Sequence, residues 1–422
     1  MISHVAASAP ARVVTLREAV NVALERNKDI QKAKEFRNVV HGRYIQERSA
    51  ALPHLTVTSG VSHQSDGSQS VMFEGFDFPT SSYAFNAEVG FTQALYTWGQ
   101  VGAAIHAAKE GVKDAEVQLE IYRQAVVRDV SAAFYDILLA RELLKLAQEN
   151  RLQKERHLDE ARRRFQEGVA TDYDVLAAEV AVQNASPEII KAENMIRIAR
   201  DHLGFLLGLD NEDVDVAGDL QAEPGPIPPF DLTQARALDN RPELKEIGHR
   251  LAIYKDAVKI YAAGDKPRLD LTGGAGWREL WMGGNQGGGW ATSVGVRMTF
   301  PAFDGGYTKG KVIQARSDVE STRIEEARLR DAIALQVRDA LSKLRESSEI
   351  LKALHGTVAE AEKLLKMSEL GFQYGVKTRL EVDDAQQNVN AVRFNLAKAR
   401  RDLIVAGITL DWVTGTLDTS EK

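Results

Sequence analysis

The sequence has no cysteine among its 422 residues, which excludes disulfide bonds and thiolate metal sites. It also has no run of about 18 apolar residues, so it predicts no transmembrane helix. The histidines form no H-x-x-x-H pair, and no nucleophile lies in a pattern with a base. We therefore expect no metal centre, no cofactor and no enzymatic activity.

The net charge is small, and residues of like charge do not form long runs. The formal net charge is −7, with acidic and basic residues interspersed, so a nucleic-acid partner is not favoured. The opening residues, MISHVAASAPARVV, lack both a charged leader region and a long apolar segment, so they do not resemble a secretion signal.

What the sequence does contain is an internal duplication. RFQEGVATDYDV begins at Arg164, and GFQYGVKTRLEV begins 207 residues later at Gly371. Earlier in each half the offset is 214, because the first half has seven extra residues between Leu55 and Thr92. The chain is predicted to hold two copies of one domain, since the period is too long for a solenoid. The predicted segments are an extension 1–14, a first repeat 15–210, a Pro/Gly-rich linker 211–230, a second repeat 231–417 and a tail 418–422.

Each repeat is predicted to run helix, strand hairpin, very long helix, turn, helix. In the first repeat the opening helix covers about 16–50 and ends before Pro53. The hairpins are expected at about 55–96 and 268–300, the long helices at about 99–168 and 306–372, and the last helices at about 174–207 and 380–413.

The predicted strands alternate between apolar and polar residues over about ten positions. Tyr83, Phe85 and Val89 share one face, whereas Asn86 and Glu88 share the other. Strands of a membrane barrel alternate in this way, with lipid on one side and water on the other. An antiparallel sheet in a soluble protein alternates in the same way, so the strands alone leave both readings open.

The long helices favour an elongated molecule. No proline interrupts 99–168, and apolar residues recur with the spacing of a coiled-coil seam in which alanine is frequent. A helix of that length extends roughly 100 Å, more than a compact domain holds. Four strands per chain cannot close a membrane barrel, so strands in lipid require several copies, and three copies would supply twelve strands.

These patterns together resemble the TolC family of outer-membrane efflux and secretion ducts. The resemblance rests on the duplicated FQxGVxT turns, on PHLTVTSG and PRLDLTGG after the first helix of each repeat, and on TQALYTWGQ and TFPAFDGGY, where a strand leads into a long helix. It covers about 15–417. Each motif is weakly specific alone, but their order and spacing are specific together.

The resemblance implies a mainly helical homotrimer. Each chain would give four strands to a shared twelve-stranded outer-membrane barrel, and the coiled-coil helices would form a tunnel through the periplasm. The segment LGLDNEDVDVAGDL and the linker would lie in a small mixed region around that tunnel. The duct would conduct substrates passively from an inner-membrane transporter through a periplasmic adaptor protein. Family members are exported, so we interpret the missing signal peptide as removed.

The simplest interpretation of the acidic residues beside the two turns is structural. Thr171 with Asp174, and Thr378 with Glu381, fit capping boxes at helix starts. Gly168 and Gly375 follow helix ends, where a left-handed conformation favours glycine.

Asp384 is different, because it lies one turn inside the helix and its repeat equivalent is Ala177. A solvated helix face is possible, but an acidic ring is the sharper hypothesis, since rings of carboxylates select cations. The resemblance places Glu381 and Asp384 at the periplasmic aperture. It also gives Lys377 the position of a residue that locks the aperture, with Asp174 or Asp172 as its expected partner.

The turns are expected at the tip of the tunnel, where the resemblance implies contact with the adaptor. The turn residues concerned are Gly168, Val169, Thr171, Gly375, Val376 and Thr378.

Two other functions each fit a single feature of the sequence. Gly305–Val312 has the G-x-x-x-x-G-K spacing of a phosphate loop but lacks the Ser or Thr that would bind magnesium. The non-enzyme alternative is a soluble coiled-coil scaffold or tether carrying a small sheet.

Overall fold

The computed structural model describes residues 12–66, 81–209 and 213–419. Most of the predicted N-terminal extension, residues 211–212 of the linker and the last residues of the tail lie outside these ranges. So do residues 67–80, which fall in the stretch to which the sequence assigns the seven extra residues of the first repeat.

Contacts along the chain define two compact units, and each takes segments from both repeats. The helical unit comprises Met1–Glu35, Val117–Leu244 and Ala327–Lys422, and the sheet unit comprises Phe36–Glu116 and Lys245–Glu326. The two sequence repeats are thus not two separate compact bodies.

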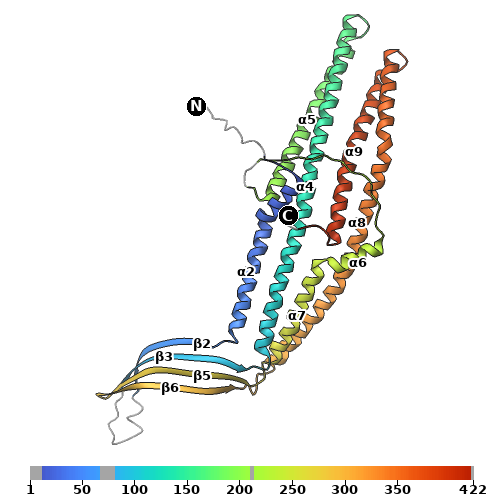
Figure 1. Cartoon of the computed structure of the whole chain (residues 1–422). Coiled ribbons are helices and arrows are strands. Elements are labelled where there is room, and N and C mark those ends of the chain that lie inside the picture. The colour runs from blue at the N-terminus through green and yellow to red at the C-terminus, as the bar shows by residue number, and fades with distance from the viewer. Residues whose placement is uncertain (1–11, 67–80, 210–212, 420–422) are drawn as a thin grey trace, which may run out of the picture. The chain divides into compact units, whose positions relative to one another are not determined.

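Four long helices dominate the helical unit, in the order α5, α4, α9, α8 (Figure 1). Ion pairs link each neighbour: α4 to α5 through Arg162, α4 to α9 through Arg401, and α9 to α8 through Arg393. Their bounds are α4 Gln100–Gln166, α5 Asp172–Leu207, α8 Tyr307–Gln373 and α9 Arg379–Val413.

The helix that opens each repeat is broken, which corrects the single helix expected over about 16–50. In the first repeat α1 (Leu16–Arg26) stops at Asn27, and α2 (Lys28–Ser49) follows. The Asn27 side chain accepts hydrogen bonds from the amides of the next turn and donates one to the carbonyl of Leu206 at 2.8 Å. The helix therefore breaks at Asn27, whose side chain forms a hydrogen bond with α5.

The second repeat breaks at the equivalent residue, Arg241. It separates α6 (Phe230–Asn240) from α7 (Pro242–Ala262), and its guanidinium donates to the carbonyl of Val413 at 3.3 Å. Val413 is the repeat equivalent of Leu206, so both breaks are anchored at the same place in the fold. Pro242 was the sequence signal for this break, because proline favours the first position of a helix.

At the end of the last helix of each repeat, a glycine lies close to the backbone at the end of that repeat's first helix. Gly208 ends α5 with φ +66, and a Cβ on it would lie 2.4 Å from the carbonyl oxygen of Arg26. Gly415 follows α9 with φ +67, and its Cβ would lie 2.9 Å from backbone of Asn240. Only glycine suits a positive φ and so close an approach.

A short two-stranded sheet lies in the helical unit. β1 (Arg12–Val14) pairs in parallel with β4 (Val214–Val216), which comes from the segment expected in the mixed region. Asp215 of β4 forms ion pairs with Arg141 of α4 and Arg200 of α5. β4 is therefore held to both α4 and α5.

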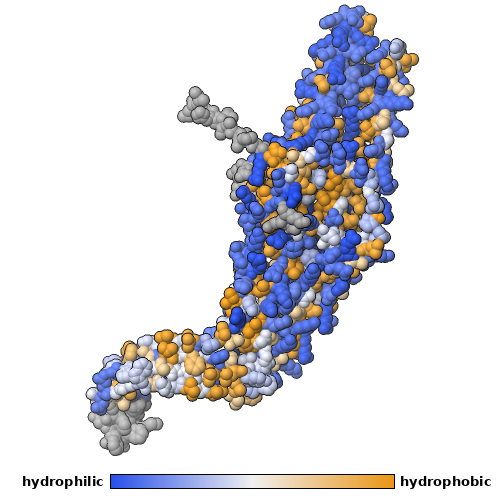
Figure 2. Space-filling view, viewed as in Figure 1, coloured by the Kyte–Doolittle hydropathy of each residue, from blue (hydrophilic) through white to orange (hydrophobic). Residues whose placement is uncertain are grey.

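The sheet unit contains one antiparallel sheet in the order β2-β3-β5-β6. Apolar side chains of its outer strands are exposed, among them Val57 on β2 and Val294 on β6. Figure 2 shows hydrophobic side chains gathered over these strands. β2 and β6 each pair on one side alone among the described residues. The strands are β2 His54–Ser65, β3 Ser81–Tyr96, β5 Arg268–Met282 and β6 Asn285–Thr299.

The turn from each hairpin into the long helix needs two successive residues with positive φ. They are Gly305 and Gly306 in the second repeat, but Trp98 (φ +53) and Gly99 in the first. Trp98 is held in this unfavourable conformation by its indole N–H, which donates to the carbonyl of Pro267 at 2.7 Å. Across the described parts of the chain, no helix is both long and apolar enough to cross a bilayer.

Candidate functional site

The two turns at the ends of the long helices have the same backbone geometry. Gly168 (φ +76) and Gly375 (φ +72) are both left-handed. The amides of Val169 and Val376 close the turns by donating to the carbonyls of Arg164 and Gly371, at 2.9 and 2.8 Å. The duplicated FQxGVxT motif therefore specifies a helix end, a left-handed glycine and a return.

Each turn leads into a capping box, as the sequence predicts. The amide of Thr171 donates to the Asp174 carboxylate at 2.8 Å, and the amide of Thr378 donates to Glu381 at 2.8 Å. The hydrogen bond from the Thr171 amide lowers the pKa of Asp174. Asp174 and Glu381 thus each stabilise a helix start, whether or not they also take part in conduction.

Lys377 precedes α9 and contacts Glu381 in the first turn of that helix, and among the described residues no ion pair joins it to Asp174 or Asp172. Its aliphatic stem lies over Gly371, where a Cβ would meet Lys377 Cγ at 2.5 Å. That position directs the ammonium group along α9. The contact with Lys377, followed by the Thr378 cap, lowers the pKa of Glu381 to about 2.

The two further acids of this turn differ in their surroundings. Asp383 forms an ion pair with Arg379 at 3.2 Å. Asp384 is exposed, and within the described residues it has no ion pair or hydrogen bond. The second turn therefore presents one carboxylate whose charge is not compensated within the chain.

A polar seam joins the two helical hairpins behind these turns, and the sequence did not reveal it. Asn390 of α9 donates to Asn150 of α4 at 2.9 Å, and Gln153 of α4 donates to Glu369 of α8 at 3.3 Å. Next to them His157 is half-buried, and burial, followed by the charge of Arg379, lowers its pKa. The partners are more than 200 residues apart, so no local pattern links them.

The glycine-rich turn before α8 does not form a phosphate site. The Asp304 carboxylate accepts hydrogen bonds from the amides of Gly306 and Thr308, at 2.9 and 2.8 Å. Those amides would have to face a phosphate in a phosphate loop. Among the described residues, no three His, Asp or Glu side chains are arranged to hold a metal ion.

Comparison with known sequences gives one family over most of the chain. The family described as outer membrane efflux protein matches residues 19–209 and 234–416. The chain is 23% identical to outer membrane protein TolC of Vibrio cholerae over 426 residues, which cover 96% of the chain and 92% of that protein. It is 24% identical to alkaline protease secretion protein AprF of Pseudomonas aeruginosa, with 96% and 85% covered.

Solved structures show the same fold. The CmeC outer membrane channel of Campylobacter jejuni superposes with a TM-score of 0.84 at 15% identity, covering 100% of this chain and 92% of that one. The open state of the MtrE outer membrane channel of Neisseria gonorrhoeae gives 0.78 at 20% identity, with 100% and 96% covered. The fold predicted from the sequence is confirmed.

Proposed function

Because the chain belongs to the outer membrane efflux protein family, we propose that three copies of it form one passive duct with an acid-lined periplasmic aperture. The protein is an outer-membrane channel of the efflux and secretion type, with a tunnel that extends into the periplasm. The scaffold alternative is not favoured, because the relatives are outer-membrane channels.

The sheet supports the proposed assembly. β2 and β6 are its edges, and an unpaired strand edge is not tolerated in lipid. If β6 of one copy pairs with β2 of the next, three copies close a twelve-stranded barrel without edges. The exposed apolar side chains of these strands, such as Val57 and Val294, would then face the hydrocarbon.

The proposed aperture lies at the second turn. The observation that supports this aperture is the exposure of Asp384, whose charge has no partner in the described part of the chain. Three copies would place three such carboxylates around one opening and favour cations over anions. Glu381 contributes less in this proposal, since Lys377 and the Thr378 amide already compensate its charge.

The partners belong to the proposal as well. We assign the two exposed turns to contact with a periplasmic adaptor, through the backbone and side chains of Val169 and Val376. An inner-membrane transporter would join through that adaptor, because nothing in the duct supplies energy. The family is one of channel proteins and is not known for enzymatic activity.

Conductance in planar bilayers tests the duct and the aperture separately. Asp384→Asn should lower cation selectivity clearly, and Glu381→Gln should lower it less. Asp339→Asn, an exposed acid of α8 far from the turn, is the control and should leave selectivity unchanged. Channels whose selectivity is unaffected by Asp384→Asn would rule out the acidic ring, and protein that forms no channels would rule out the duct.

A further inference from the structure

The second repeat carries exposed aromatic side chains where its last strand leads into its long helix. β6 ends at Thr299, and Phe300, Phe303 and Tyr307 follow with exposed fractions of 54%, 91% and 68%. Aromatic side chains are enriched at the boundary between a bilayer and water. All four strands of the sheet meet helices at this end, so in the proposed barrel it lies at the periplasmic boundary of the membrane.

One cation lies among these aromatic side chains. The ammonium group of Lys311 is 5.8 Å from the ring centroids of both Tyr307 and Tyr261, so it faces one ring of α8 and one ring of α7. The turn after α7 lies against the start of α8, because a Cβ on Gly264 would come within 3.0 Å of Thr308 Oγ1. Two elements of the second repeat therefore build one group, the Lys311 cluster, which consists of Lys311, Tyr307 and Tyr261.

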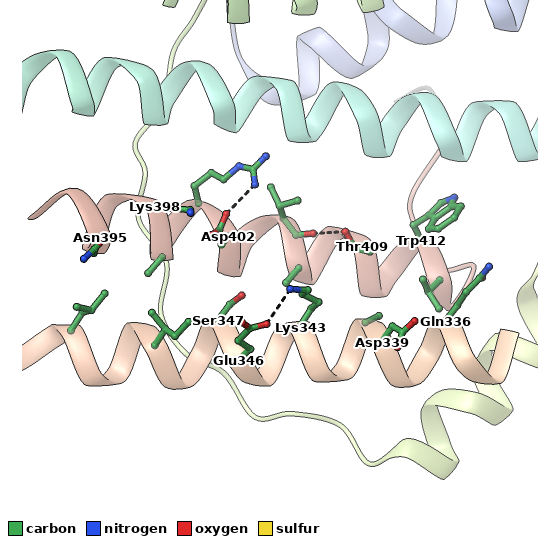
Figure 3. Close-up of a pocket in the computed structure, with 18 residues that line it drawn as sticks. Gln336, Asp339, Lys343, Glu346, Ser347, Asn395, Lys398, Asp402, Thr409 and Trp412 are labelled. Carbon is green, nitrogen blue, oxygen red and sulfur yellow. Dashed lines mark hydrogen bonds and ion pairs between the residues drawn. The ribbon is translucent and has the colours of Figure 1, made fainter. Parts of the chain in front are cut away.

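No carboxylate compensates the charge of this cluster within the described residues. Lys311 forms no ion pair there, and Asp304 of the same turn is bonded to two backbone amides at the start of α8. Further along the same helix an exposed lysine does have a partner. Lys343, which lines the groove between α8 and α9, pairs with Glu346 at 3.1 Å (Figure 3).

The first repeat shows that the turn itself does not require the Lys311 cluster. The three equivalent positions of the first repeat are occupied by Gln100, Ala104 and Glu47. Both repeats nevertheless form the same turn, with two successive residues of positive φ before the long helix. A structural role shared by both turns therefore does not explain the cation and its two tyrosines.

We propose that the Lys311 cluster binds the headgroup phosphate of an anionic phospholipid in the leaflet that borders the periplasm. The ammonium group of Lys311 would pair with the phosphate, and the hydroxyl groups of Tyr261 and Tyr307 would donate hydrogen bonds to its oxygens. Phe303, in the turn that precedes α8, would lie against the acyl chains. The inference rests on the barrel proposed above, because only a sheet in the membrane brings lipid to this end.

The surroundings of the cluster favour this ligand over two others. A free anion would leave the aromatic surface beside the cluster in water, whereas a phospholipid covers both the charge and that surface. A zwitterionic headgroup brings an ammonium group of its own, and the carboxylate of Asp304 is already engaged with backbone amides. Phosphatidylglycerol should therefore bind in preference to phosphatidylethanolamine.

Native mass spectrometry of the detergent-solubilised assembly tests this preference. The protein is given equal amounts of phosphatidylglycerol and phosphatidylethanolamine with the same acyl chains, and it should retain more of the phosphatidylglycerol. Lys311→Gln should lower the ratio of the two lipids about fivefold, the contribution of one basic residue near an anionic lipid surface. Lys311→Arg keeps the charge and should keep the ratio.

Lys309→Gln is the matched control. It removes the same charge from the same turn of α8, but residues two apart do not share a helix face, so the ratio should be unchanged. Equal losses in Lys309→Gln and Lys311→Gln would overturn the site, as would a natural protein that retains both lipids equally. Inorganic phosphate at the concentration of the lipid should displace none of it, and equal competition would show an anion site without lipid.

Phe303→Ser separates the acyl chains from the headgroup. It should lower the retained amount of both lipids and leave their ratio unchanged, and unchanged amounts would contradict the contact with the acyl chains. Conductance of the natural protein in planar bilayers of phosphatidylethanolamine reports on the duct separately. A conducting protein without the lipid preference refutes the lipid site and leaves the proposed function standing, whereas a protein that forms no channels contradicts the duct.

Discussion

Glu381 and Asp384 lie one helical turn apart, and their surroundings give them different roles. Glu381 accepts a hydrogen bond from the Thr378 amide and contacts Lys377, whereas Asp384 is exposed and has no hydrogen bond or ion pair within the described residues. The sequence predicted both as aperture residues. The structure supports ranking Asp384 first for conduction and Glu381 first for the helix start.

The helix start should be insensitive to acid over a wide range. The pKa of Glu381 falls from its usual 4.5 to about 2, so the stability it contributes is present above 4.5 and is lost as the pH falls through about 2. The amides of α9's first turn should therefore keep their protection from hydrogen exchange down to about pH 3. Fraying of this turn near pH 4.5 would contradict the prediction, and Glu381→Gln should exchange faster at neutral pH.

Trp98 offers a test of backbone strain at one residue. Trp98→Ala and Trp98→Gly both remove the indole hydrogen bond to Pro267, but only alanine still has to adopt φ +53. The glycine variant should therefore be the more stable by about 1 kcal/mol in denaturant or thermal unfolding. Equal stability of the two variants would show that Trp98 carries no backbone strain. Gly305→Ala, at the equivalent turn, should show the same cost.

At the scale of elements, each repeat has an opening helix broken into two pieces, one helix of 67 residues, and a last helix of 36 or 35 residues. Asn27 and Arg241 end the first short helix, and Gly208 and Gly415 let the last helix of each repeat approach it. The sequence predicts long helices at about 99–168 and 306–372, and the structure has α4 at Gln100–Gln166 and α8 at Tyr307–Gln373. The sequence missed the break at Asn27, because the bond that stabilises it reaches Leu206, 179 positions away.

Alanine substitutions at two glycines at the end of α5 should differ in their effect on stability, because only one of the two positions requires glycine. Gly208→Ala should destabilise the protein by about 2 kcal/mol or more, because φ is positive and the Cβ would meet the Arg26 carbonyl. Gly204→Ala, one turn earlier in α5, meets no atom within 4 Å and should be neutral or stabilise by up to about 1 kcal/mol. The measurement is thermal unfolding of both variants. An unchanged stability of Gly208→Ala would refute the argument from close backbone approach.

At the scale of the whole molecule, the proposed function depends on which face of the sheet meets lipid. Val294→Lys places a charge on the apolar face and should cost about 2–4 kcal/mol near the bilayer midplane, so that less protein assembles in the outer membrane. Ser293→Lys places the same charge on the opposite face and should assemble normally. The amount of assembled protein in outer-membrane fractions is the measurement, and equal amounts would contradict the assigned faces.

The sequence by itself determined the duplication, the order of hairpin, long helix, turn and last helix in each repeat, and the two capped turns. The helices, hairpins and caps depend on residues within a few positions of one another, and the duplication shows as repeated motifs, so these patterns can be found without a structure. Only the tertiary structure decided which acid is compensated, that Lys377 contacts Glu381, and that a polar seam joins the hairpins through Asn150 and Asn390. The physical reason is distance along the chain: a side chain's partner is set by the packing of helices more than 200 residues apart, and local patterns do not encode that packing.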